Sequence, residues 1–223
     1  MIFPIGDEQV QGGYFPLFSY SFIAINIAVF VLEFSLQTQG KLAGFITEYG
    51  AIPNEIVHGQ DLHTLLTSMF MHGGWMHLIG NMVFLWVFAD NIEATVGNLT
   101  FLIFYVLGGL AAVAGHVYFD ADSLVPMVGA SGAISAVMGA YLVMFPTSKI
   151  KMLFFIMIFH IPAFIFLFFW IFQQMTAGMA SFDGVNLELD NVAYWAHIGG
   201  FVFGLAAGLL FRMMGKLEGV VVK

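Results

Sequence analysis

The chain has 223 residues, of which 60% are hydrophobic and 9% are charged, whereas about 25% of the residues in a soluble domain are charged. This composition excludes an ordinary soluble protein and predicts an all-α, polytopic membrane protein. The formal net charge of −8 argues against nucleic acid as a partner, and the absence of cysteine excludes disulfides and thiolate metal sites.

Six stretches of the chain are apolar enough and long enough to cross a bilayer, which takes about 20 helical residues. We predict a six-transmembrane-helix bundle with spans at about 17–36, 75–92, 99–119, 128–146, 152–175 and 193–214. Residues 1–16 are expected to be a short N-terminal segment, and residues 215–223 a short tail. No cleavable signal is expected, because the first segment contains Asp7 and Glu8 but neither lysine nor arginine.

The connector at 37–74 is too long to be a plain turn. It contains a run of apolar and polar residues from Asp61 to His72, and loops of this length usually have a function. We therefore expect a partly structured element at the membrane surface.

Basic residues cluster in the connector after the fourth span and in the tail after the sixth: Lys149, Lys151, Arg212, Lys216 and Lys223. With six spans these two segments lie on one side, which the positive-inside rule makes cytoplasmic. The N- and C-termini are then cytoplasmic, and we expect a multi-pass protein of a prokaryotic inner membrane. The second, fourth and sixth spans all run inward from the outer face.

Three polar residues from distant parts of the chain lie in the first turns of these inward-running spans. His77 lies in the second span, Ser131 in the fourth and His197 in the sixth. The orientation therefore brings all three to a similar depth below the outer face.

Ser131 is either a small residue at a helix contact or a nucleophile. Small residues recur every four positions in the fourth and sixth spans, namely Ser131, Ser135, Gly139, Gly200, Gly204 and Gly208. This spacing allows two membrane helices to touch closely, so packing alone explains all of these positions. The same contact points His197 at Ser131, since His197 lies three residues before Gly200 on that face.

An adjacent neutral imidazole activates a serine hydroxyl by taking its proton. No carboxylate is placed in the sequence to orient His197, so we predict a Ser-His dyad. A tetrahedral intermediate also needs hydrogen-bond donors. His77 and Asn81 share one face of the second span, and the backbone N–H of Ser131 begins a helix. The alternative is that His77 and Asn81 only hydrogen-bond between helices.

These residues stand in three motifs, which are His72-Gly73-Gly74-Trp75-Met76-His77 followed by Asn81, Gly129-Ala130-Ser131-Gly132, and Ala196-His197-Ile198-Gly199-Gly200. In this order, over about 50–214, the chain resembles the rhomboid family of intramembrane serine proteases. The resemblance implies a six-helix core and a water-filled cavity open to the outside. It also implies cleavage of single-pass membrane proteins near the outer end of their transmembrane helix.

The resemblance assigns a role to each matching position. Ser131 is the nucleophile and His197 the base, while His77, Asn81 and the Ser131 backbone form the oxyanion hole. His72 matches a position that supports the first loop. Supporting positions in the second and third motifs and on the sixth span are Gly129, Gly132, Gly200 and Gly204.

The chain departs from the family pattern at three places. His63-Thr64 stands where a Trp-Arg pair is frequent, and Ser135 stands where some members have an aromatic residue that stacks on the base. No arginine follows Glu93. The anchoring of the first loop and the packing around His197 are therefore left open.

The fifth span, rich in phenylalanine, is either a lipid-facing helix or a lateral gate against the second span. Pro162 inside this span would weaken its helix. The resemblance also implies that the loop at 176–192 caps the cavity from outside. His116 and His160 have no neighbour at helical ligand spacing, so we expect neither a metal nor another cofactor.

Three functions are compared. The first is an intramembrane serine endopeptidase, whose partners are single-pass transmembrane substrates and the lipid bilayer. The second is an inactive rhomboid-like protein that binds membrane helices, and the third is a transporter. Because both Ser131 and His197 are present and no internal repeat is found, the first is favoured. The sequence predicts neither the substrate nor the oligomeric state.

Overall fold

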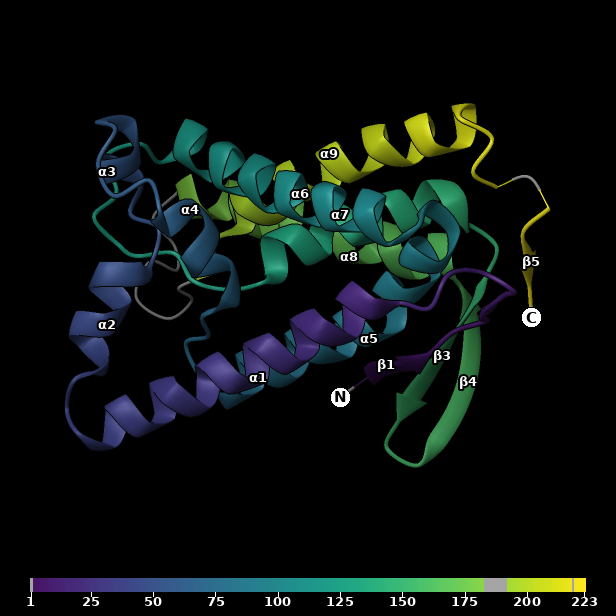
Figure 1. Ribbon diagram of the computed structural model, residues 1–223, viewed down its shortest axis with the longest axis horizontal. Coiled ribbons are helices and arrows are strands. Elements are labelled where there is room, and N and C mark those ends of the chain that lie inside the picture. The colour runs from purple at the N-terminus through teal and green to yellow at the C-terminus, as the bar shows by residue number, and fades with distance from the viewer. Residues whose placement is uncertain (1, 183–191, 218) are drawn as a thin grey trace.

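The computed structural model describes residues 2–182, 192–217 and 219–223. Six long helices make up most of it, namely α1 (Leu17–Thr38), α5 (Trp75–Val96), α6 (Asn98–Phe119), α7 (Ser131–Met144), α8 (Ala163–Phe182) and α9 (Tyr194–Met213). They run side by side as one bundle (Figure 1). The predicted all-α membrane bundle is confirmed.

Four of these helices are long and apolar enough to cross a membrane by themselves, namely α1, α6, α9 and residues Ala163–Ala180 of α8. Helix α7 is shorter, with 14 residues, which at 1.5 Å per residue is about 21 Å, less than the roughly 30 Å of a hydrocarbon core. Its residues from Gly132 to Tyr141 are all buried. Helix α7 is therefore surrounded by protein, and Ser131 at its first turn lies inside the bundle.

The close approach of α7 and α9 depends on glycine, as the spacing predicts. A Cβ atom added at Gly204 would lie 2.0 Å from the Ala136 carbonyl oxygen, and one at Gly200 would lie 2.2 Å from that of Gly132. Gly132 itself faces α6, where an added Cβ would lie 2.5 Å from the Cβ of Ala112. Side chains at these positions would push the helices apart.

The first connector is structured, as expected. It contains four short helices, α2 (Leu42–Tyr49), α3 (Pro53–Val57), α4 (Thr64–Thr67) and the 3-10 helix η1 (Ser68–Phe70). Figure 1 shows α2, α3 and α4 together at one end of the bundle. Where a Trp-Arg pair was absent, His63 contacts the backbone carbonyl of Glu48 at 3.2 Å, so a different contact joins α4 to α2.

The prediction of a helical span at 152–175 is wrong in its first part. Strands β3 (Lys149–Phe154) and β4 (Met157–Pro162) form an antiparallel hairpin there, and α8 begins only at Ala163. Strand β1 (Ile2–Gly6) pairs with β3, which gives a three-stranded sheet in the order β1-β3-β4. An apolar run alone does not distinguish a strand from a helix. Here the N-terminal strand β1 supplies a partner for β3.

This correction changes the role of Pro162. The residue lies at the end of β4, immediately before α8, and not inside a helix. A missing N–H is harmless at that position, so Pro162 does not weaken the helix. A second small sheet pairs β2 (Val10–Gln11) with β5 (Val221–Val222), which joins the two ends of the chain.

Glu93, which lacks the expected arginine, has a different partner. Its carboxylate accepts the backbone N–H groups of Phe18 at 2.8 Å and Ser19 at 2.7 Å, and also the Ser19 hydroxyl at 2.7 Å. The first N–H groups of a helix have no intrahelical acceptor, and a negative charge there is favoured by the helix dipole. Glu93 therefore joins α5 to the start of α1.

Helix α8 exposes a broad apolar face, which agrees with the lipid-facing interpretation: Phe164, Ile165, Phe168, Phe169, Phe172, Met175 and Met179. Ring contacts between α5 and α8 are formed by Phe166, which lies 5.9 Å from Phe84 and 6.0 Å from Phe88. The gate remains a prediction. Of the expected cap at 176–192, residues 176–182 belong to α8, and residues 183–191 lie outside the described residues.

Candidate active site

Ser131 and His197 are in contact. The Oγ atom of Ser131, the first residue of α7, lies 2.8 Å from Nε2 of His197, in the first turn of α9. The approach of the two helices through Gly200 and Gly204 sets this distance. The structure therefore brings together two of the three polar residues expected at one depth.

Gln174, on α8, holds the other side of the His197 ring. Its Oε1 atom lies 2.7 Å from Nδ1 of His197, and its side chain is buried. Because an amide oxygen only accepts hydrogen bonds, Nδ1 must carry the proton. In a neutral ring, Nε2 is then unprotonated and faces the serine hydroxyl as an acceptor.

Gln174 was not predicted from the sequence, where only a carboxylate was considered as the group that orients His197. An amide within an apolar helix is a signal that would have found it, since polar residues at membrane depth usually have a specific partner. The three residues come from α7, α8 and α9, so the structure has a triad-like arrangement with an amide as its third member.

Aromatic packing around His197 also comes from other helices than the family pattern suggests. Trp170 on α8 lies 5.9 Å from the imidazole centroid, and Tyr194 on α9 lies 6.5 Å from it. Ser135 is buried, and its hydroxyl donates to the Ser131 carbonyl at 2.6 Å. The space next to the His197 ring is therefore lined by side chains from α8 and α9.

His77 lies on the other side of the serine. The backbone N–H of Gly73 donates to Nδ1 of His77 at 3.3 Å, so in the neutral ring the proton is on Nε2. A Cβ atom added at Gly129 would lie 2.8 Å from Nε2 of His77 and 3.4 Å from Oγ of Ser131. The point between the two groups is open because residue 129 is glycine.

The backbone conformation at residue 129 also favours glycine. Its φ angle is +137°, a conformation that other residues rarely adopt. Its N–H donates to the carbonyl of Ser68 at 2.9 Å, which ties the start of α7 to η1. A small cavity of about 30 Å³ borders Ser131, Gly129 and Ser68, larger than the roughly 10–15 Å³ that one water needs.

The partner of Asn81 is His72. Its Nδ2 atom lies 2.9 Å from Nε2 of His72, and both side chains are buried. Burial, together with the neighbouring His77, lowers the pKa of His72 to about 3, so the ring is neutral and accepts the amide N–H. The backbone N–H of His72 donates to the Glu33 carboxylate at 3.1 Å. His72 thus joins the first connector to α1 and α5.

A family model for the rhomboid domain matches residues 59–214. The chain belongs to the rhomboid family. It is 34% identical to rhomboid protease GluP of Bacillus subtilis over 130 residues, which cover 57% of this chain and 24% of that protein. It is 27% identical to the mitochondrial rhomboid protein 1 of Saccharomyces cerevisiae over 194 residues, 85% of this chain and 51% of the yeast protein.

A third relative is the putative rhomboid protease YdcA of Bacillus subtilis, 33% identical over 124 residues, which cover 56% of this chain and 61% of YdcA. This rhomboid chain spans about a quarter of GluP and about half of the yeast protein. The family includes serine intramembrane proteases and inactive members. Membership therefore supports an integral membrane protein with a protease fold.

Proposed function

We propose that this rhomboid protein is an intramembrane serine endopeptidase that cleaves transmembrane segments of single-pass membrane proteins. Ser131 is the nucleophile and His197 is the general base. The observation that supports the proposal most is the 2.8 Å contact between Oγ of Ser131 and Nε2 of His197. That contact is within the reach required for proton transfer.

In the first half of the reaction, Nε2 of His197 takes the hydroxyl proton while Oγ of Ser131 bonds to the scissile carbonyl carbon. The carbonyl oxygen becomes an oxyanion. The C–N bond then breaks as Nε2 returns the proton to the leaving amine, which leaves an ester on Ser131. In the second half, water attacks the ester and gives a proton to Nε2 of His197. The bond between the carbonyl carbon and Oγ then breaks as His197 returns that proton to Oγ, which restores the hydroxyl and releases the carboxylic acid.

The oxyanion needs donors near Ser131. Nε2–H of His77 and the backbone N–H of Ser131, which has no acceptor within its own helix, are the proposed ones. An amide nitrogen has two hydrogens, so the contact of Asn81 with His72 leaves one for the oxyanion. We propose Asn81 as a third donor.

The proposed orientation follows from charge. The termini are assigned to the cytoplasm of a prokaryotic cell, because the basic residues gather at that end of the bundle. Ser131 is near the opposite end, so cleavage is expected near the outer face of the membrane.

A fluorophosphonate probe tests the chemistry directly. The full-length protein in detergent should be labelled at Ser131, and Ser131→Ala or His197→Ala should abolish labelling. Ser35→Ala, a matched change at an exposed serine on α1, should be labelled as the unchanged protein is. A folded but unlabelled protein would instead favour an inactive member that binds membrane helices.

A further inference from the structure

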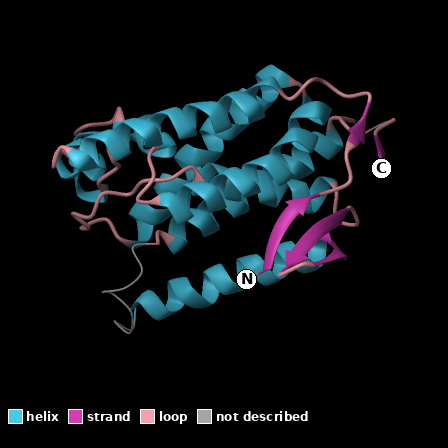
Figure 2. Ribbon diagram, turned by 90° about the horizontal axis from the view of Figure 1, so that it is seen from below, coloured by secondary structure: helices cyan, strands magenta, loops and turns pink. Residues whose placement is uncertain are grey.

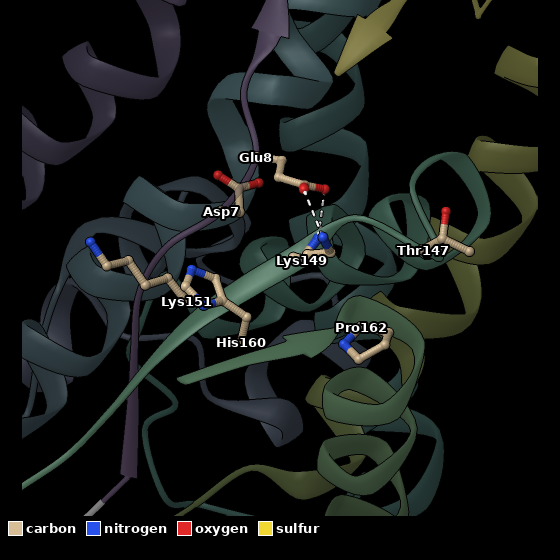
Figure 3. Close-up of a pocket in the computed structure, with 7 residues that line it drawn as sticks. All are labelled: Asp7, Glu8, Thr147, Lys149, Lys151, His160 and Pro162. Carbon is tan, nitrogen blue, oxygen red and sulfur yellow. Dashed lines mark hydrogen bonds and ion pairs between the residues drawn. The ribbon is translucent and has the colours of Figure 1, made fainter. Parts of the chain in front are cut away.

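The β3–β4 hairpin has one face directed to the protein and one directed away from it. Ile150 and Met152 are buried in the core, while Lys149 and Lys151 alternate with them on the other face. His160 pairs with Lys151 across the hairpin, so it lies on the same face. Figure 3 shows Lys151 beside His160, with Lys149 farther along the strand. The base of the hairpin therefore presents a basic row.

The tip of the hairpin is apolar and uncovered. From Phe154 to Phe159 every residue is apolar, and Ile156 is 94% exposed, Phe155 75% and Met157 64%. Such a run in water would be unfavourable and prone to aggregation. The tip thus needs an apolar environment that the described part of the chain does not supply.

The position of the hairpin identifies that environment. Strand β4 ends at Pro162 and the membrane-spanning α8 starts at the next residue, so the base of the hairpin lies at a membrane surface. Figures 1 and 2 show the strands at one end of the bundle, crossing the helix direction instead of following it.

A cavity of about 490 Å³ lies at the base of the hairpin, lined by Lys149, Lys151, His160, Asp7 and Glu8 among others (Figure 3). The two acidic residues are already engaged. Glu8 pairs with the Lys149 ammonium group at 3.9 Å, and Asp7 accepts the amide of Asn91 at 2.6 Å. Lys151 has no ion-pair partner within the described ranges.

We propose that the β3–β4 hairpin binds anionic phospholipid. The segment 154–159 inserts among the acyl chains of the adjacent leaflet, and Lys151 with His160 contacts the phosphate of a head group in the cavity. An apolar wedge with basic residues behind it is the arrangement that binds an anionic lipid surface. A water-soluble phosphate compound would use the cavity but would leave the apolar tip exposed.

The position of the tip is directly measurable, because the chain has no cysteine. Ile156→Cys carries a single environment-sensitive fluorophore in full-length protein placed in phosphatidylcholine nanodiscs with or without phosphatidylglycerol. We expect quenching by lipid-attached quenchers and protection from iodide, whereas Gln60→Cys, exposed in the first connector, should show the reverse. A water-exposed probe at 156 would overturn the proposal.

The head-group contact is tested by native mass spectrometry of retained lipid. Lys151→Gln should lower the preference for phosphatidylglycerol over phosphatidylcholine about fivefold, Lys151→Arg should preserve it, and Lys216→Gln should not change it. Equal retention of the two lipids by the unchanged protein would overturn the proposal. Displacement of the lipid by inorganic phosphate alone would overturn it too, because the site would then bind free anions.

Discussion

Oε1 of Gln174 lies 2.7 Å from Nδ1 of His197, on the opposite side of the ring from Ser131. The hydrogen bond keeps the Nδ1 proton in place and leaves Nε2 free to accept the proton of the serine. In a Ser-His-Asp triad a carboxylate has this position and also stabilises the imidazolium by its charge. Here a neutral amide orients the ring without placing a charge at membrane depth.

Gln174→Leu removes that hydrogen bond and should slow labelling and cleavage by roughly 10–100-fold, less than the approximately 10⁴-fold loss when a triad Asp no longer selects the tautomer. Gln174→Glu should retain most activity and move the acidic limb of the pH profile upward, because a carboxylate favours the imidazolium. Gln173→Leu, at the exposed neighbouring position, is the matched control. Unchanged rates in Gln174→Leu would show that the amide does not position the base.

Gly129→Ala should abolish labelling of Ser131. The new Cβ would lie 2.8 Å from Nε2 of His77, and the φ angle of +137° is unfavourable for alanine. Gly80→Ala, where an added Cβ meets nothing within 4 Å, should be labelled normally. Thermal unfolding of both variants separates a blocked site from a misfolded one, and full activity in Gly129→Ala would contradict the proposed oxyanion position.

Gly204→Ala should destabilise the bundle. Its Cβ would lie 2.0 Å from the Ala136 carbonyl oxygen, so α7 and α9 must separate. Overpacking of this kind costs about 1–3 kcal/mol, and for a chain of this size that lowers the melting temperature by roughly 2–12 °C. Gly44→Ala in α2, which meets nothing within 4 Å, is the control. A melting temperature equal to that of the unchanged protein would argue against close packing.

Asp7 makes stability depend on pH. Burial raises the pKa of Asp7 from 3.8 to about 7, although hydrogen bonds from Tyr141 and Asn91 oppose this and Asp90 adds to it. Between those values the unfolded chain has lost the proton and the folded chain retains it, so unfolding releases a proton. The free energy of unfolding should therefore decrease as pH rises from about 4 to 7, by up to roughly 4 kcal/mol, and level off above.

Asp7→Asn tests this dependence. The variant should show a flatter stability curve over the same pH range and should be the more stable protein at pH 8. The measurement is the thermal unfolding of the protein in detergent as a function of pH, with Asp61→Asn in the first connector as the control. A variant curve parallel to that of the unchanged protein would assign the pH dependence to other groups.

Several features follow from residue type and spacing alone. Long apolar stretches that do not pair with another strand form the predicted helices. The bounds expected at 17–36 and 193–214 lie within two residues of the ends of α1 and α9. The glycine and serine spacing on the fourth and sixth spans predicts a close contact, because only small side chains allow two backbones to approach. From that contact the pairing of Ser131 with His197 follows.

The tertiary structure decided the rest, because those features depend on partners from distant parts of the chain. The apolar run after residue 149 is equally suited to a strand or a helix, and it forms strands because β3 pairs with β4 on one side and with β1 on the other. Gln174 reaches His197 only through the rotation of α8 about its axis, which packing sets. The sequence predicted that the polar side chain of Asn81 would face the bundle. The position of His72, whose backbone is held by Glu33, decided that Asn81 contacts the His72 ring.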